Sequence, residues 1–208
     1  LAMGLSSRLN QPVVVENRVG ADGAILRHAR RPTPAADGDA ILTVVHELIE
    51  ELSAGTEVQT VGVAAPGFID LERSMVRYAP NIDWHDEPVR GQLEERLPGW
   101  TITLDNDANA AGWAEWRFGA GRGVHDMVLL TIGTGVGGAV VAGGALLRGG
   151  FGSAAELGHM HLVPNGRACG CGRHGCLEQY GSGRALMRYA NELADAGGVG
   201  QGLARLRE

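Results

Sequence analysis

The stretch GHMHLVPNGRACGCGRHGC, Gly158 to Cys176, contains every cysteine of the chain. With His159 these cysteines follow the pattern His-x9-Cys-x-Cys-x4-Cys. One imidazole and three thiolates suit a closed tetrahedral zinc site, and metal binding would then shape a loop that has few apolar side chains. One disulfide and a free thiol is the alternative, although a Cys-x-Cys disulfide is strained. We therefore predict a structural zinc site whose ligands are His159, Cys169, Cys171 and Cys176.

Two carboxylates flank this predicted metal site. Glu156 lies three residues before His159, and Glu178 lies two residues after Cys176. Closing the metal site would bring both carboxylates toward one small region. Grouped carboxylates suggest that hydroxyl groups are bound there, and a solvated surface position is the simpler alternative.

A further acidic segment follows an apolar run, in TLDNDANAAGWAE from Thr103 to Glu115. We expect a strand over Trp100 to Leu104 and a helix that continues to about Phe118. Asp105, Asn106 and Asp107 would then lie where a strand ends and a helix begins, a common place for ligand-binding groups. Taken alone, Asp107 is more typical of a helix N-cap than of a catalytic base.

Glycine-rich sequence marks a third feature, Gly133-Thr-Gly-Val-Gly-Gly138. It matches a dinucleotide-binding pattern, which requires a helix after the glycines. Here the apolar run 139–142 follows, then Gly143-Gly144 and a third run at 145–147. We therefore predict a β-meander whose first turn offers N–H groups and Thr134 to a phosphate. The uncharged stretch 127–147 is long enough for a membrane helix, but its six glycines argue against one.

Composition restricts the function further. The chain of 208 residues has 33 glycines, a net charge of −6 and 18 basic residues, all of them arginine. Without lysine, a P-loop kinase is excluded. The negative charge argues against nucleic-acid binding, and we expect no membrane association and a cytoplasmic location.

Elsewhere the periodicity predicts alternating helices and strands. Asp39 is expected to cap a helix that ends at Gly55, with an apolar stripe at Ile41, Leu42, Val45, Leu48, Ile49 and Leu52. A strand over 59–64 and a turn at Pro66-Gly67 should follow. Ser182 should cap a last helix, 183–196, whose stripe Leu186, Tyr189, Ala190 and Leu193 is expected to be core.

Six ordered motifs together resemble the ROK family of sugar kinases and repressors, most closely its bacterial glucokinases of the actinobacterial type. They are APGFID (65–70), APNIDW (79–84), LDNDANAA (104–111), LTIGTGVGGA (130–139), GSAAELGHM (152–160) and CGCGRHGCLEQYGSG (169–183). The resemblance implies an α/β, actin-like ATPase (ribonuclease H-like) fold with two domains, both incomplete here: residues 21–120 on the sugar side, and 121–208 with the zinc loop.

The resemblance also implies a reaction and its residues. Asp107 would be the general base on the 6-hydroxyl of glucose or a similar hexose, with Mg-ATP or polyphosphate as the phosphoryl donor. The implied sugar contacts are Gly67, Asn81, Asn106, Glu156, His159 and Glu178. The implied donor loop is formed by Gly133, Thr134, Gly135 and Gly138. A homo-oligomer is expected for the intact parent, and a non-catalytic sugar-binding module, either a truncated kinase or a repressor-type sensor, is the alternative.

The first twenty residues depart from this family. They lack the Asp-x-Gly-Gly-Thr phosphate loop with which family members open, and instead LSSRLNQPVVVENRVGADG resembles a segment of tricarboxylate-receptor proteins. We therefore expect residues 1–20 to be an atypical segment that replaces the first phosphate-loop hairpin. A chain without that hairpin and without a C-terminal half is expected to phosphorylate glucose slowly.

Overall fold

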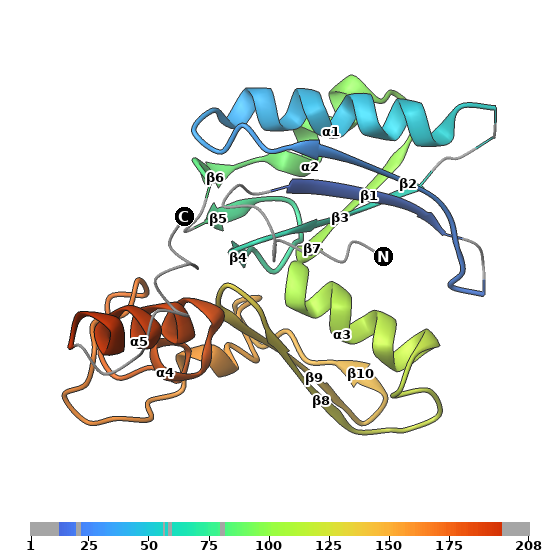
Figure 1. Cartoon of the computed structure of the whole chain (residues 1–208). Helices are drawn as coiled ribbons and strands as arrows, with labels where there is room; N and C mark the ends of the chain where they lie inside the picture. The colour runs from blue at the N-terminus through green and yellow to red at the C-terminus, as the bar shows by residue number, and fades with distance from the viewer. Residues whose placement is uncertain (1–12, 20–21, 56, 58–59, 80–81, 197–208) are drawn as a thin grey trace. The chain divides into compact units, whose positions relative to one another are not determined.

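A computed structural model describes residues 13–19, 22–55, 57, 60–79 and 82–196 (Figure 1). The chain divides into two compact units. Unit 1 comprises residues 1–130 and 138–156, and unit 2 comprises residues 131–137 and 157–208. The boundary expected at residues 120–121 therefore lies inside unit 1.

Unit 1 begins with an antiparallel hairpin of β1 (Val13–Val19) and β2 (Ile25–Pro32). The turn is stabilised by the Asp22 carboxylate, which accepts the N–H of Ala24 at 3.0 Å. Residues 13–19 of the segment expected to be atypical are thus one strand of a hairpin with the residues that follow.

Helix α1 (Gly38–Ser53) carries the predicted stripe, and all six of its apolar residues are buried. The predicted cap, however, is wrong by two residues. Asp37 is the N-cap, because its backbone is extended and its carboxylate accepts the N–H of Ala40 at 3.0 Å. Asp39 lies in the first turn of the helix and pairs with Arg96 instead.

The core of unit 1 includes two parallel strands, β3 (Thr60–Ala65) and β7 (Thr101–Asn106). Sixteen buried apolar residues from these strands, α1, α2 (Val89–Arg96) and neighbouring segments form one cluster. Burying a side chain of this kind contributes about 1.5–3 kcal/mol. In the parallel register Ala65 lies opposite Asn106, so Pro66-Gly67 and the acidic segment begin at the same edge of the sheet.

Three short strands, β4 (Phe68–Ile69), β5 (Val76–Tyr78) and β6 (His85–Glu87), form an antiparallel sheet after β3. Helix α3 (Asp107–Phe118) follows β7 directly. It approaches β9 (Val136–Ala142) so closely that a Cβ on Gly112 would lie 2.3 Å from the Cβ of Ala139.

The predicted meander is confirmed. Strands β8 (Met127–Ile132), β9 and β10 (Ala145–Leu146) form one sheet in the order β10-β9-β8. A strand therefore follows the glycine-rich turn, as predicted, and the dinucleotide-binding interpretation is excluded. Among the helices that the structure describes, none is both long enough and apolar enough to cross a bilayer.

Unit 2 contains a 3-10 turn (Leu157–His159) and the helices α4 (Glu178–Gly181) and α5 (Gly183–Asp195). Ser182 caps α5 as predicted, with its hydroxyl accepting the N–H of Ala185 at 3.1 Å. The expectation that the α5 stripe is core is wrong within the described residues. Leu186 is 69% exposed and Leu193 is 54% exposed, and Ala185 is the buried residue of this helix.

Candidate functional site

The first part of the site lies where β7 passes into α3. Asn106 is the N-cap of α3, because its amide oxygen accepts the N–H groups of Ala108 at 2.9 Å and Asn109 at 3.1 Å. The prediction of Asp107 as the cap is therefore wrong. The amide nitrogen of Asn106 donates to the carbonyl of Gly67 at 3.0 Å, so two of the predicted sugar contacts lie together.

Gly67 is required by its surroundings as well as by its backbone. Its φ is +108°, and a Cβ there would lie 2.2 Å from the carbonyl oxygen of Tyr78. No side chain fits in that position, so the backbone of Gly67 itself forms this part of the surface.

Asp107 is the first residue of α3, and its side chain keeps contact with solvent. Crowding by neighbouring atoms desolvates the carboxyl and raises its pKa, although N–H groups of Ala108 and of Asp107 itself and the amide of Asn106 oppose this effect. A carboxylate with a raised pKa is a better proton acceptor near neutral pH. Asp107 is therefore a chemically suitable general base.

Asp105, for which the sequence predicted only a place between strand and helix, is the most heavily paired carboxylate of this region. Its Oδ2 accepts Nε of Arg148 at 3.2 Å and Nη2 at 2.6 Å, and Arg73 Nη2 lies 3.3 Å away. The side chain is only 13% exposed. Arg148, which ends a long uncharged stretch, was the available signal that a buried carboxylate would need a partner.

The predicted motif that begins at Gly152 also contacts the motif 65–70. Gly152 has a φ of +80°, and a Cβ there would lie 2.5 Å from the carbonyl oxygen of Ile69. Next to it, burial raises the pKa of Asp70, but hydrogen bonds from the Ser74 hydroxyl and from the N–H groups of Met75 and Ser74 outweigh this effect and lower it. Glu156 ends unit 1, and Asn81 lies outside the described residues.

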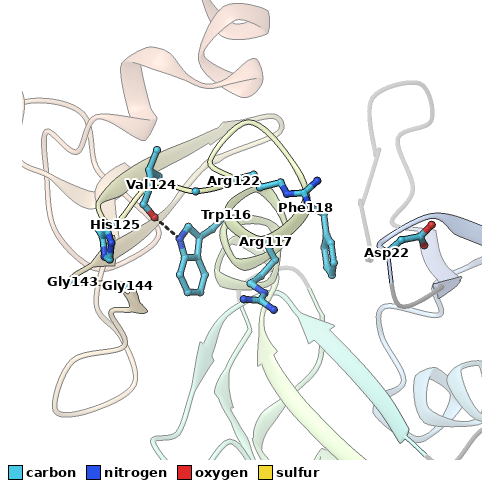
Figure 2. A pocket seen from close by; sticks show the side chains of 10 residues that line it. Asp22, Trp116, Arg117, Phe118, Arg122, Val124, His125, Gly143 and Gly144 are labelled. Carbon is cyan, nitrogen blue, oxygen red and sulfur yellow. Dashed lines mark hydrogen bonds between the residues drawn. The ribbon is translucent and has the colours of Figure 1, made fainter.

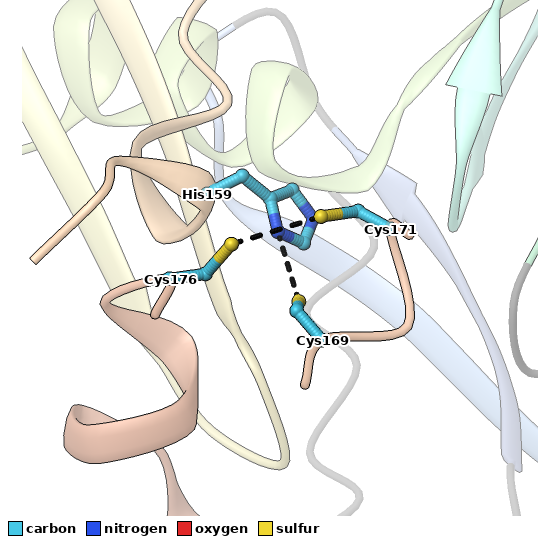
Figure 3. A group of neighbouring side chains, drawn as sticks. All are labelled: His159, Cys169, Cys171 and Cys176. Carbon is cyan, nitrogen blue, oxygen red and sulfur yellow. Dashed lines mark hydrogen bonds between the residues drawn. The ribbon is translucent and has the colours of Figure 1, made fainter. Parts of the chain in front are cut away.

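The four predicted metal ligands converge within unit 2 (Figure 3). One ligand atom from each of His159, Cys169, Cys171 and Cys176 lies within 4.8 Å of all the others. The chain turns tightly at Cys169–Gly172, where the N–H of Gly172 donates to the carbonyl of Cys169 at 3.0 Å. All three cysteines are free thiols, so the disulfide alternative is not found.

Two of the distances between ligand atoms match those expected around a tetrahedral zinc ion. Zinc–sulfur bonds of about 2.3 Å and zinc–nitrogen bonds of about 2.0–2.1 Å imply tetrahedral edges of about 3.8 Å between sulfurs and about 3.6 Å from nitrogen to sulfur. The Sγ atoms of Cys171 and Cys176 are 3.7 Å apart, and Cys169 Sγ is 3.5 Å from His159 Nδ1. Burial and the two neighbouring thiols raise the pKa of Cys176 to about 12, and a bound cation would reverse this shift.

The glycine-rich turn between β8 and β9 packs against the helices of unit 2. The carbonyls of Gly133 and Thr134 accept the N–H groups of Gly183 at 2.7 Å and of Arg184 at 3.3 Å. The N–H of Val136 donates to the Glu178 carboxylate at 3.0 Å. Gly138, which was predicted to belong to this loop, is buried within β9 and belongs to unit 1.

A hollow of about 860 Å³ lies within unit 1 near the C-terminal end of α3 (Figure 2). Its lining includes Trp116, whose indole N–H donates to the Val124 carbonyl at 2.9 Å. A smaller hollow of about 570 Å³ includes His161 and His174 in unit 2. Neither hollow is lined by Asp107 or by a predicted sugar contact, so neither coincides with the predicted sugar site.

Comparisons with known proteins identify the family. The sequence model of the ROK family matches residues 4–202. The match extends beyond the region 65–183 that contains the six motifs. A glucokinase of Streptomyces coelicolor is 46% identical over 178 residues, covering 86% of this chain and 56% of that protein. An N-acetylmannosamine kinase of Escherichia coli O157:H7 is 40% identical over 185 residues, covering 86% of this chain and 61% of that protein.

A solved structure of a ROK family glucokinase from Streptomyces griseus, in complex with glucose and AMPPNP, is also similar. It has 44% identity and a TM-score of 0.81, with 88% of this chain and 58% of that chain covered. The similarity confirms the actin-like α/β fold expected from the motifs. This chain spans a little over half the length of the glucokinases it matches. The family model, the relatives and the fold together show that the chain belongs to the ROK family.

Proposed function

We propose that this protein transfers the γ-phosphoryl group of ATP to the 6-hydroxyl of glucose, with polyphosphate as the alternative donor. The observation that carries the proposal is the solvent-contacting carboxylate of Asp107, whose pKa is raised, beside Asn106 and Gly67. Support comes from the similar glucokinases, one of which was solved with glucose and AMPPNP.

In the proposed reaction Asp107 accepts the proton of the 6-hydroxyl. The oxygen of that hydroxyl forms a bond to the γ-phosphorus, the bond from phosphorus to the bridging oxygen breaks, and ADP leaves. Asn106 fixes the position of Asp107 by capping α3, and its side-chain amide, which also interacts with the Gly67 carbonyl and the Asp107 carboxyl, is a proposed sugar contact.

The remaining proposed sugar contacts are Asn81, Glu156, His159 and Glu178, with the backbone of Gly67. His159 would bind both the metal and the sugar. Its Nδ1 faces Cys169 and would bind the metal, which leaves Nε2 for a sugar hydroxyl. A bound zinc would hold the ligand loop in shape and would take no part in the phosphoryl transfer. Several polar groups around one sugar would select its stereochemistry, since each buried group left unpaired costs about 1–3 kcal/mol.

The proposed donor loop is Gly133, Thr134 and Gly135, together with Gly138, which is buried within β9. A turn of this kind presents backbone N–H groups that suit a phosphate. We also propose a cytoplasmic location, no binding to nucleic acid and a homo-oligomeric state. The net charge of −6 supports the second of these.

Calorimetry with millimolar glucose tests sugar binding without requiring turnover. We expect weak binding that is lost in the Glu156→Ala, Glu178→Ala double variant and retained in Glu95→Gln, an exposed carboxylate on α2. Binding that is unchanged in the double variant would contradict the sugar site. Coupled assays with ATP and with polyphosphate then identify the donor, and the glucose 6-phosphate formed should be lost in Asp107→Asn.

A non-catalytic sugar-binding module is the second candidate. It is favoured in its repressor-type form by a xylose repressor of Bacillus subtilis, which is 31% identical over 163 residues, covering 78% of this chain and 42% of that protein. Glucose binding without glucose 6-phosphate formation from either donor would support this candidate and contradict the kinase.

A further inference from the structure

Val136 lies between two segments that flank the metal ligands, and all three belong to unit 2. Its N–H donates to Oε2 of Glu178, two residues after Cys176, at 3.0 Å. Its carbonyl faces Gly158, which precedes His159, and a Cβ on Gly158 would lie only 2.0 Å from that oxygen. Through Val136 the glycine-rich loop therefore contacts both segments, one with its N–H and the other with its carbonyl.

Gly135 shows how tightly the Glu178 carboxylate fits against this loop. A Cβ on Gly135 would lie 2.3 Å from Glu178 Oε2 and 3.2 Å from its carboxyl carbon. The backbone of Gly135 has no positive φ, so an alanine there would have to displace the carboxylate but would not strain the backbone. Glycine at this position thus allows the carboxylate to reach the N–H of Val136.

We infer that Glu178 is a positioning residue, whose carboxylate holds the Gly133–Gly135 turn in one conformation through the N–H of Val136. A hydrogen bond from an N–H to an ionised carboxylate is roughly twice as strong as a bond between neutral groups. The inference rests on the proposed function in two respects only: that this turn binds the phosphoryl donor, and that Glu178 contacts a sugar hydroxyl. One carboxylate would then contact the sugar with one oxygen and hold the donor loop with the other.

Such a shared carboxylate makes sugar binding and loop order interdependent. A sugar that fixes the Glu178 side chain would also strengthen its bond to Val136, and an ordered loop would in turn favour sugar binding, because coupling between two sites is reciprocal. The metal-ligand segments would supply the rigid support for both contacts.

The test measures amide hydrogen exchange at Val136 by NMR in the full chain with zinc bound. In Glu178→Ala we expect exchange at Val136 to become about tenfold faster, because its acceptor is lost. Glu178→Gln keeps an oxygen acceptor and should restore most of the protection. The N–H of Leu162, which donates to the Gly175 carbonyl at 2.8 Å in the same unit, is the control and should not change.

Gly135→Ala tests the same contact with Glu178 present. The added methyl group should displace the carboxylate and accelerate exchange at Val136 as much as Glu178→Ala does, and the double variant should add nothing further. If Glu178→Ala does not fold, Gly135→Ala alone decides the question. Unchanged exchange at Val136 in a folded variant with normal zinc content would overturn the inference.

Addition of glucose separates this inference from the proposed function. Faster exchange at Val136 in Glu178→Ala, in a chain that binds no glucose, supports the positioning role although the proposed function fails. Loss of glucose affinity in Glu178→Ala with unchanged exchange at Val136 leaves sugar contact as the sole role of Glu178, and the positioning role is then wrong.

Discussion

Unit 1 buries sixteen apolar residues in a single cluster, whereas the described part of unit 2 buries four, Val136, Cys169, Cys176 and Ala185. Two of those four, Cys169 and Cys176, are themselves predicted metal ligands. The large apolar side chains of α5 are exposed instead. A hydrophobic core therefore stabilises unit 1. We expect unit 2 to depend on a metal bound at its ligand cluster, because small units with little core generally require a metal or a disulfide.

Removing the metal should cause the largest loss of structure, and it should do so in unit 2 alone. With Cys176→Ser or a strong chelator we expect residues 157–195 to lose their exchange protection, because structural zinc contributes about 10–16 kcal/mol in small zinc-dependent peptides. The helices of unit 1 should stay protected. Exchange measured by mass spectrometry, with zinc content by elemental analysis, checks this.

His174→Ala is the matched control for metal removal, since His174 lies in the same loop but outside the ligand set. It should retain about one zinc. Persistent protection of residues 157–195 after the zinc has been lost would show that unit 2 does not depend on its metal.

Truncating a core side chain should instead destabilise unit 1 and leave the metal site intact. Leu104 is fully buried in unit 1, and Leu104→Ala should lower the free energy of unfolding by about 2–5 kcal/mol while zinc content stays normal. The matched change Leu186→Ala on exposed α5 should cost less than about 0.5 kcal/mol. Denaturant titration checks both, and equal costs at the two positions would contradict the assignment of the cores.

A smaller effect is expected at Asp105. Asp105→Asn removes the charge that pairs with Arg148 and Arg73 and leaves two partly buried guanidinium groups without it. We expect a loss of about 1–3 kcal/mol in unfolding free energy, less than for a fully buried ion pair. A variant as stable as the parent at pH 7 would show that the pair is not stabilising.

The neighbouring Asp107 should behave differently. Its pKa is raised in the folded state, so its contribution to stability is full below the ordinary value of 3.8 and is lost as the pH rises through the folded value. Asp107→Asn should therefore raise unfolding free energy at pH 7 by less than about 1 kcal/mol, with no gain below pH 3.8.

Activity at Asp107 should change in the opposite sense to stability. In the proposed reaction Asp107→Asn should lower kcat by about 10²- to 10⁴-fold. Thermal unfolding at both pH values and a coupled assay measure the two effects. A destabilised variant that retained its turnover would assign Asp107 a structural role.

Local sequence predicted several features in which one segment contains the whole interaction. The stripe of α1 follows from helical periodicity, and the meander follows from glycine pairs between apolar runs. The predicted metal ligands His159, Cys169, Cys171 and Cys176 lie within eighteen consecutive residues, and they converge as their spacing predicted. Two of the three predicted N-caps, Asp39 and Asp107, were misplaced, because Asp and Asn are both good caps and only the backbone conformation selects between nearby candidates.

Only the tertiary structure decided which distant groups meet. Asn106 contacts Gly67 across 39 residues, Arg148 pairs with Asp105 across 43, and Glu178 reaches Val136 across 42. The first contact depends on the parallel register of β3 and β7, and the others depend on how loops fold back onto strands. Residue type determines which groups need a partner, whereas the packing of strands and loops determines which partner lies within reach.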